Sequence, residues 1–312
     1  MHFAHLISRL LVIIMKKLSL ATALLLAMTG AQAYQFEVQG QSEFIDNTTD
    51  AQDFSGAVQG TYYFKNVDAT KGPLAEAAFV NQASNVALAY NYGENKFAGE
   101  RTVNHVYGAK AEAYIPTSIV PTYVSAAYSH TIQDNKTGLA DDQGDRYALE
   151  LGAVVVPNFL VAVGYTSVAD QTSFDAFNMV SNGVAKAAIE TLTIADKKDA
   201  ITARTKYVGA IDDTNMYISF ETGLVYGRDT AYNLKTDLFV TPALSMGVSY
   251  AESSYNNSPD KAWGVNVNYF VTPAVSVGAS YVNANFESNL AAEADSVVLD
   301  TQTVGVNAKF RF

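Results

Sequence analysis

The sequence of 312 residues contains no cysteine. Disulfide bonds and metal sites with thiolate ligands are therefore excluded, and a chain without thiols suits export through an oxidising compartment. Basic residues are also few: 20 lysines and arginines stand against 31 aspartates and glutamates, which gives a formal net charge of −11. This acidity argues against a nucleic acid as the partner.

Residues 1–33 have the features of an export signal. A basic pair, Lys16 and Lys17, precedes an apolar stretch, and small residues ending at Ala33 supply a cleavage site. Translation would start either at the first residue or at Met15, and an uncleaved signal anchor is the alternative. Cleavage would remove three bases and no acid, which leaves a formal charge of −14 on 279 residues.

Long apolar runs are missing from the remaining chain. No stretch reaches about eighteen consecutive apolar residues, so we expect no membrane-spanning helix. A closed β-barrel can still cross a bilayer, because its strands show only alternate residues to lipid, and such a wall has a mean hydropathy near zero, as this chain does.

One stretch of the sequence occurs twice. FVTPALSMGVSY, residues 239–250, returns as FVTPAVSVGASY, residues 270–281, with nine of the twelve positions identical. From residue 244 onward apolar and polar residues alternate, which is the period of a strand with one apolar face. The Thr-Pro pair before it predicts a tight turn, because proline fixes φ and cannot donate to a strand ladder.

Alternating segments of this kind continue to the last residue, and they predict about fourteen antiparallel strands, within a range of 12–16. Short connections such as 157–158, 212–214 and 241–242 alternate with longer polar ones at 133–145, 169–199 and 289–298. Short periplasmic turns and longer extracellular loops are typical of an outer-membrane barrel. The predicted strands are 34–44, 54–65, 75–92, 102–115, 122–132, 146–156, 159–168, 201–211, 215–226, 230–240, 243–252, 261–271, 274–286 and 299–312.

Aromatic residues recur at a fixed distance from the turns. Tyr165, Tyr250 and Tyr281 each follow a turn proline by eight residues. Eight residues of a tilted strand climb about 20 Å, which is close to the height of the apolar band of such a barrel. We therefore expect these tyrosines, together with Trp263, at the membrane interface. Packing in the core of a soluble sandwich is the alternative.

The C-terminal stretch TVGVNAKFRF alternates apolar and polar residues and ends on phenylalanine. With Phe310 and Phe312 on its apolar side, it resembles the assembly signal that the barrel-insertion machinery of Gram-negative bacteria reads. Together with the Thr-Pro-x-x-Ser-x-Gly-x-x-Tyr hairpins, it makes the sequence resemble the putative general bacterial porin family over residues 34–312. General porins suggest a homotrimer, for which the sequence shows no interface.

Charged residues on the inward parity are candidates for the pore lining, because a permeating ion meets the side chains that the lumen displays. Each alternates with an apolar neighbour that must face lipid, where a cation would cost roughly 2–4 kcal/mol at mid-depth. The resemblance to porins implies a transverse field between acids and bases, whereas some of these residues could instead lie at the rims. The candidates are Lys110, Glu112, Glu150, Arg204, Lys206, Glu221, Lys235 and Asp237.

The connection 169–199 is much longer than the others, and loops of this length are usually functional. Its stretch from Asp175 to Leu192 predicts a short helix. The resemblance implies a loop that folds into the lumen and constricts it. An extracellular cap and an additional hairpin are the alternatives.

Motifs of catalysis are absent. His105 and His130 have no motif partner, and there is no nucleophile elbow, phosphate loop or zinc spacing. The acidic stretch 141–145 lacks the spacing of a calcium loop, so we expect it to be solvated, with a divalent bridge to lipopolysaccharide as the alternative. We therefore expect neither an enzyme nor a bound cofactor or metal.

These observations predict an all-β protein: a transmembrane antiparallel β-barrel in the outer membrane of a Gram-negative bacterium. It would act as a water-filled channel for passive diffusion of small hydrophilic solutes and ions. Its partners would be outer-membrane lipid and lipopolysaccharide, the barrel-assembly machinery and the permeating solutes. The alternatives are a solute-specific channel, a non-conducting structural or adhesive barrel, and a soluble β-sandwich.

Overall fold

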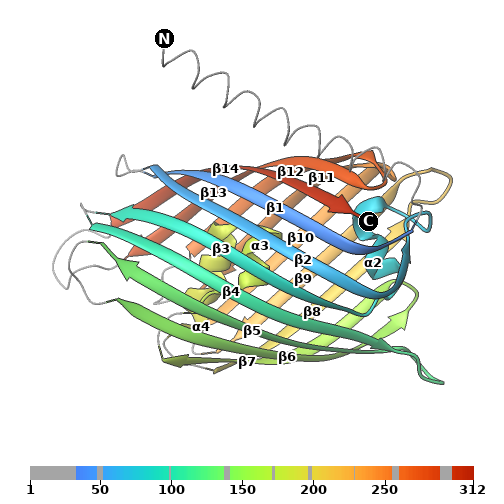
Figure 1. Ribbon diagram of the computed structural model, residues 1–312, viewed down its shortest axis with the longest axis horizontal. Coiled ribbons are helices and arrows are strands. Elements are labelled where there is room, and N and C mark those ends of the chain that lie inside the picture. The colour runs from blue at the N-terminus through green and yellow to red at the C-terminus, as the bar shows by residue number, and fades with distance from the viewer. Residues whose placement is uncertain are drawn as a thin grey trace, which may run out of the picture.

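The computed structural model describes residues 33–47, 52–97, 100–136, 141–170, 173–195, 199–227, 229–254, 260–288 and 297–312. Its fourteen described strands pair antiparallel in chain order, and the first lies beside the last, so that the sheet closes into a barrel (Figure 1). Residues 1–32 of the predicted export signal lie outside the described residues, and cleavage of the signal stays a prediction.

The strands agree with the predicted segments within a few residues, with one exception. They are β1 (Ala33–Asn47), β2 (Gln52–Asp68), β3 (Asn85–Phe97), β4 (Glu100–Ile115), β5 (Thr122–Asn135), β6 (Asp142–Val156), β7 (Phe159–Asp170), β8 (Asp199–Ala210), β9 (Tyr217–Tyr226), β10 (Thr230–Thr241), β11 (Leu244–Ser253), β12 (Asp260–Thr272), β13 (Val275–Ser288) and β14 (Val297–Arg311). The helical segments are η1 (Leu74–Glu76), α2 (Ala77–Val80), α3 (Ala176–Asn182) and α4 (Val184–Ala195). Among these described helices, none has the length and apolar character needed to cross a membrane.

The exception is the third strand, which was predicted at 75–92 and begins only at Asn85. Pro73 has φ −61° and starts a helical turn, a position at which proline is tolerated because no backbone donor is lost there. The apolar residues that follow, including Leu74 and Ala77, are buried against the inside of the barrel. A run of apolar residues this short fits a helical turn as well as a strand, which is why the prediction was wrong here.

The two faces of the wall follow the predicted alternation. In β12 the outward residues have exposed fractions between 39% and 57%, and they are Trp263, Val265, Val267, Tyr269 and Val271. The inward residues Asn266 and Asn268 line the interior instead. Closure leaves no free sheet edge, so every strand can satisfy its backbone groups within the sheet.

The connections define two ends of the barrel. At the turn end, where β1 begins and β14 ends, β6 and β7 are joined by Pro157 and Asn158, and Asn158 has a positive φ of 59° that asparagine tolerates. The connection 69–84 at this same end is sixteen residues long and carries η1 and α2, so the short-turn pattern has one departure. We call residues 69–84 the turn-end segment. The connection with α3 and α4 belongs to the opposite end, which we call the loop end. Helices α3 and α4 lie inside the barrel (Figure 1).

Candidate functional site: the barrel lumen

Helix α3 is capped at its N-terminus, and the junction between α3 and α4 contacts the first strand. The Asp175 carboxylate accepts hydrogen bonds from the backbone N–H groups of Phe177 (2.8 Å) and Asn178 (3.1 Å), which caps α3. Gly183 separates the helices at φ 85°, and the Glu43 carboxylate of β1 occupies the place where a Cβ would lie. Any other residue at 183 would be strained and would displace Glu43.

Apolar contacts join the helices to opposite walls. From α3, Phe177, Met179 and Val180 pack against alanines and Val106 of β3 and β4. From α4, Ala185 and Ile189 pack against a group of small or β-branched residues, namely Ala251, Ala262, Val282 and Ala284 on β11, β12 and β13. The connection predicted as an insert therefore crosses the lumen from wall to wall and narrows it. The predicted helix is confirmed as two shorter ones.

A buried ion pair fastens the helices to a third wall. Arg146 of β6 has an exposed fraction of 3%, and its guanidinium donates to the carboxylate of Glu190 on α4. Asn178 of α3 donates to the same carboxylate, and Asp175 lies 3.9 Å from the guanidinium. Removal of either charge would leave its partner in the lumen without its nearest counter-charge.

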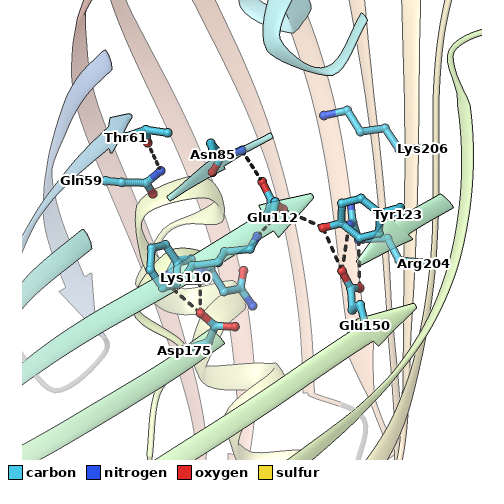
Figure 2. Close-up of polar contacts among 12 residues, drawn as sticks. Gln59, Thr61, Asn85, Lys110, Glu112, Tyr123, Glu150, Asp175, Arg204 and Lys206 are labelled. Atoms are coloured by element: carbon cyan, nitrogen blue, oxygen red, sulfur yellow. Dashed lines mark hydrogen bonds and ion pairs between the residues drawn. The ribbon is translucent and has the colours of Figure 1, made fainter. Parts of the chain in front are cut away.

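A line of alternating charges crosses the inner wall from β4 to β9, and Figure 2 shows its part from Lys110 to Lys206. Lys110 lies 2.8 Å from Glu112, and Tyr123 donates to Glu112 at 2.7 Å. Arg204 donates to both oxygens of Glu150, at 2.9 and 3.2 Å. Arg204 also donates to the hydroxyl of Tyr123 at 3.1 Å, which joins the two pairs. We call this set, together with Lys206 and Glu221, the charged belt.

The charged belt continues into the turn-end segment. Lys206 of β8 lies 3.5 Å from Glu221 and 3.0 Å from Glu76 of η1. Its ammonium also lies 5.2 Å from the ring centroid of Phe79, within the range of a cation–π contact. The turn-end segment therefore folds inward and narrows the lumen from the side opposite to α3 and α4.

Two cavities lie in the space that remains. One of about 410 Å³ adjoins α4 and the inner face of β10 to β14, and one of about 250 Å³ lies between the charged belt and the turn-end segment. They share charged residues, including Lys110 and Arg204. On β11 to β14 the larger cavity is lined, besides Lys309, mainly by neutral polar side chains; their hydroxyls and amides belong to Ser245, Ser249, Asn266, Asn268, Ser276, Ser280 and Asn307. We call these side chains the hydroxyl–amide wall.

Glycines of the duplicated sequence make room for this wall. Gly247 and Gly278 occupy equivalent positions in the two copies, and both face inward. The side chains of Asp237 and Asn266 fill the space where a Cβ of Gly247 would lie. The amides of two neighbouring strands, Asn268 and Asn307, do the same at Gly278.

The structure brings together most of the residues predicted to line a pore. Seven of the eight line one or both cavities; the exception is Glu150, which holds the guanidinium of Arg204. Lys235 and Asp237 lie on the next strand, β10, at 3.8 Å from each other, and Lys235 stands opposite Glu221 in the ladder between β9 and β10. Their effect on permeation stays a prediction.

Glu76, Lys186 and Tyr123 are among the residues of the site that the sequence did not reveal. Glu76 lies in a helical turn within the wrongly predicted strand, and Lys186 lies on α4, so strand parity could place neither. Tyr123 lies on a strand, but an aromatic residue on an alternating strand is expected to face lipid. Its exposed fraction is 0%, and only the neighbouring inward charges could have signalled its position.

The predicted interface aromatics all lie on the outer wall. Tyr165 and Trp263 have exposed fractions of 50% and 46%, and the Trp263 ring packs on that of Tyr281 with centroids 5.6 Å apart. Tyr250 pairs with Trp263 in the ladder between β11 and β12. Tyr165 donates to Asp199 at 2.8 Å at the loop end. Their location at a membrane interface stays a prediction.

The C-terminal residues close the barrel. Phe312 exchanges backbone hydrogen bonds with Phe36 of β1, at 2.8 and 2.9 Å, and the two rings stack with centroids 5.4 Å apart. Phe310 and Phe312 remain outward and exposed, at 39% and 49%. Their recognition by the assembly machinery stays a prediction.

Metal-binding groups are not found in the described ranges, where no cluster of three or more His, Cys, Asp or Glu side chains could hold an ion. His130 instead lies 2.8 Å from Asp145, and Tyr128 donates to the same carboxylate oxygen at 2.6 Å. Asp145, predicted in a solvated loop, is part of β6.

Comparison with known proteins identifies the family. A family model described as putative general bacterial porin matches residues 8–310. The chain belongs to this family. Among solved structures, the porin is similar to the outer membrane protein Omp33 of Acinetobacter baumannii, with 52% sequence identity and a TM-score of 0.66, over 90% of this chain and 99% of that chain. No curated protein matches the porin.

More distant structures share the fold alone. The CymD monoaromatic hydrocarbon channel has a TM-score of 0.55 at 8% identity, over 91% of this chain and 90% of that chain. A FadL homologue of Pseudomonas aeruginosa has a TM-score of 0.51 at 7% identity, over 92% of both chains. The porin is thus a channel-type barrel of the Gram-negative outer membrane, with its apolar wall in the lipid and lipopolysaccharide environment. Family and neighbours suggest a channel and not an enzyme.

Proposed function

We propose that this porin is a water-filled channel for passive diffusion of small hydrophilic solutes and ions, without catalytic turnover and without a resident cofactor. The observation that carries the proposal is the cavity of about 410 Å³ inside a closed barrel, with charged and neutral polar side chains around it. A permeating solute would exchange part of its hydration shell for these groups.

Two constrictions would set the size of the solutes that pass. Helices α3 and α4 narrow the lumen from the loop end, and the turn-end segment narrows it from the turn end. Both signs of charge line the cavities, since most cations are paired with carboxylates. The pore would therefore pass small ions of both signs, with a selectivity set by the few groups that are less completely paired.

The outer wall would serve insertion and anchoring. We propose that Tyr165, Tyr250, Trp263 and Tyr281 lie at the membrane interface, because they lie on the apolar outer face, where Tyr165 and Tyr250 also donate to carboxylates. Phe310 and Phe312 would present the C-terminal signal to the barrel-assembly machinery. A homotrimer would follow the general porins, and the mass of the detergent-solubilised porin by light scattering tests it.

Conductance in planar lipid bilayers tests the proposed function. The refolded mature porin should give steady ohmic current in KCl, and neutral solutes small enough to enter should lower that current only through the viscosity of the solution. Saturable block by one solute would favour the solute-specific channel. Silence of a correctly folded barrel would overturn the proposed function and favour a structural barrel.

A further inference from the structure

One cation of the lumen differs from the others. Seven cationic side chains line the two cavities, and six of them lie within 4.0 Å of a carboxylate oxygen. Lys186 is the seventh, and the structure places no carboxylate of the described residues within that distance. The other six are Lys110, Arg204, Lys206, Lys235, Lys309 and Arg311.

The ammonium of Lys186 meets a hydroxyl group instead. It donates to the side-chain oxygen of Ser249 on β11 at 2.6 Å. An ammonium group carries three donors, and this is the one acceptor that the described residues offer it. Lys186 lies in the third position of α4, on the connection that crosses the lumen, so a permeating solute passes close to it.

The groups around Lys186 favour a solute with a single negative charge. The hydroxyl–amide wall offers donors and acceptors to the uncharged part of a solute. Glu43 and Asp237 line the same cavity, so a doubly charged anion such as phosphate would meet more repulsion than a singly charged one. A carboxylate fits this balance, because it carries one charge and accepts hydrogen bonds from both ammonium and hydroxyl groups.

We propose that Lys186 and Ser249, together with the hydroxyl–amide wall, form a binding site for the carboxylate of small organic acids that permeate this porin. The inference rests on the proposed function, because the site acts on solutes already in the pore. The carboxylate would take the place of water at Lys186, while Ser249 would turn its hydroxyl toward the second oxygen. The site would retain organic anions briefly and would favour them over neutral solutes of equal size.

Block of single-channel KCl current by benzoate tests the site. In the wild-type porin, benzoate should block at lower concentration than either benzyl alcohol, its neutral counterpart, or phosphate. In Lys186→Gln the benzoate concentration for half block should rise about tenfold, because a hydrogen bond to a charged group is lost. Ser249→Ala should show a smaller increase, and Lys186→Arg should retain the block.

A matched control separates this site from a general effect of charge. Lys261 lies on β12 outside the two cavities, so Lys261→Gln removes the same charge and should leave the block unchanged. Equal block of the wild-type and Lys186→Gln porins would overturn the inference and leave the proposed function intact. A phosphate block as strong as that of benzoate would overturn the preference for carboxylate. A silent wild-type porin would overturn the proposed function and the site with it.

Discussion

The guanidinium of Arg311, the penultimate residue, lies 2.7 Å from the carboxylate of Glu37 on the first strand. Arg311 has an exposed fraction of 1%, and it also donates to the backbone oxygen of Leu74 at 2.8 Å. The rings of Tyr34 and Phe270 lie 4.5 and 4.6 Å from its guanidinium carbon. One side chain therefore joins the closing seam of the barrel, the turn-end segment and β12.

Replacement of Arg311 by methionine should destabilise the barrel. Among the described residues, Lys309 would remain as the ionic partner of Glu37, at 3.0 Å, and the loss of a buried partner costs about 3–5 kcal/mol. The temperature at which the folded band disappears in heated gel samples should fall. The double variant Arg311→Met with Glu37→Gln should recover part of that loss, and an unchanged temperature in the single variant would contradict this role of the ion pair.

Deletion of residues 172–196 should increase single-channel conductance, because it removes the helices that cross the lumen between opposite walls. Planar bilayer recordings measure the effect. A milder variant, Arg146→Met, removes the counter-charge of Glu190 and should produce fluctuating conductance levels as α4 leaves its wall. Identical recordings for the deletion variant and the wild-type porin would show that α3 and α4 do not limit the pore.

Glu76→Gln should shift the ion selectivity toward anions. The variant keeps the shape of the side chain but removes one of the two carboxylates of Lys206, so the charged belt gains net positive charge. The reversal potential in a KCl gradient reports the shift. Glu252→Gln serves as the control, because it removes an equal charge at the outer rim, where Glu252 accepts from Tyr232 at 2.7 Å. Equal reversal potentials for Glu76→Gln and the wild-type porin would count against this position in the ion path.

Benzoate block should weaken as the pH rises through about 8. Burial in the first place, and the nearby charge of Lys235 in the second, lower the pKa of Lys186 to about 8. Below that pH the ammonium form binds a carboxylate, and above it the neutral amine does not. The titratable groups that face Lys186 are Glu43 of β1 and Lys235 and Asp237 of β10.

Lys186→Arg provides the control for this pH profile. Arginine stays charged throughout the range, while the facing groups are unchanged. Block by benzoate between pH 7 and 9 should therefore be flat in the variant and should fall in the wild-type porin. Parallel profiles would assign the titration to another group.

The barrel could be predicted from the sequence because its physical cause repeats along the chain. Each strand meets lipid on one face, so residues such as Val265 and Val267 alternate with Asn266, and this local period is visible without any contact information. The same parity placed Lys110, Arg204 and other charges inward. Parity has no meaning in a helix, which is why Glu76 and Lys186 were missed.

Contacts between residues far apart in the sequence could not be predicted either. Glu37 and Arg311 lie 274 positions apart, and nothing local in either strand indicates that closure brings them together. For a related reason, the sequence did not decide whether the connection with α3 and α4 enters the lumen or covers the barrel from outside. A short amphipathic helix can cap a barrel or enter it, and the decision depends on the small residues of distant strands, such as Ala251 and Ala284, which leave space for Ile189.

The glycine that recurs in the duplicated segment links the width of the pore to the amino-acid sequence of its wall. At Gly247 and Gly278 the amides of the neighbouring asparagines occupy the space where a Cβ would lie. Even an alanine at either position would push these amides toward the centre and reduce the free cross-section at that height. In addition to their lipid-facing pattern, the two hairpins thus contain glycines that help to set the internal diameter of the channel.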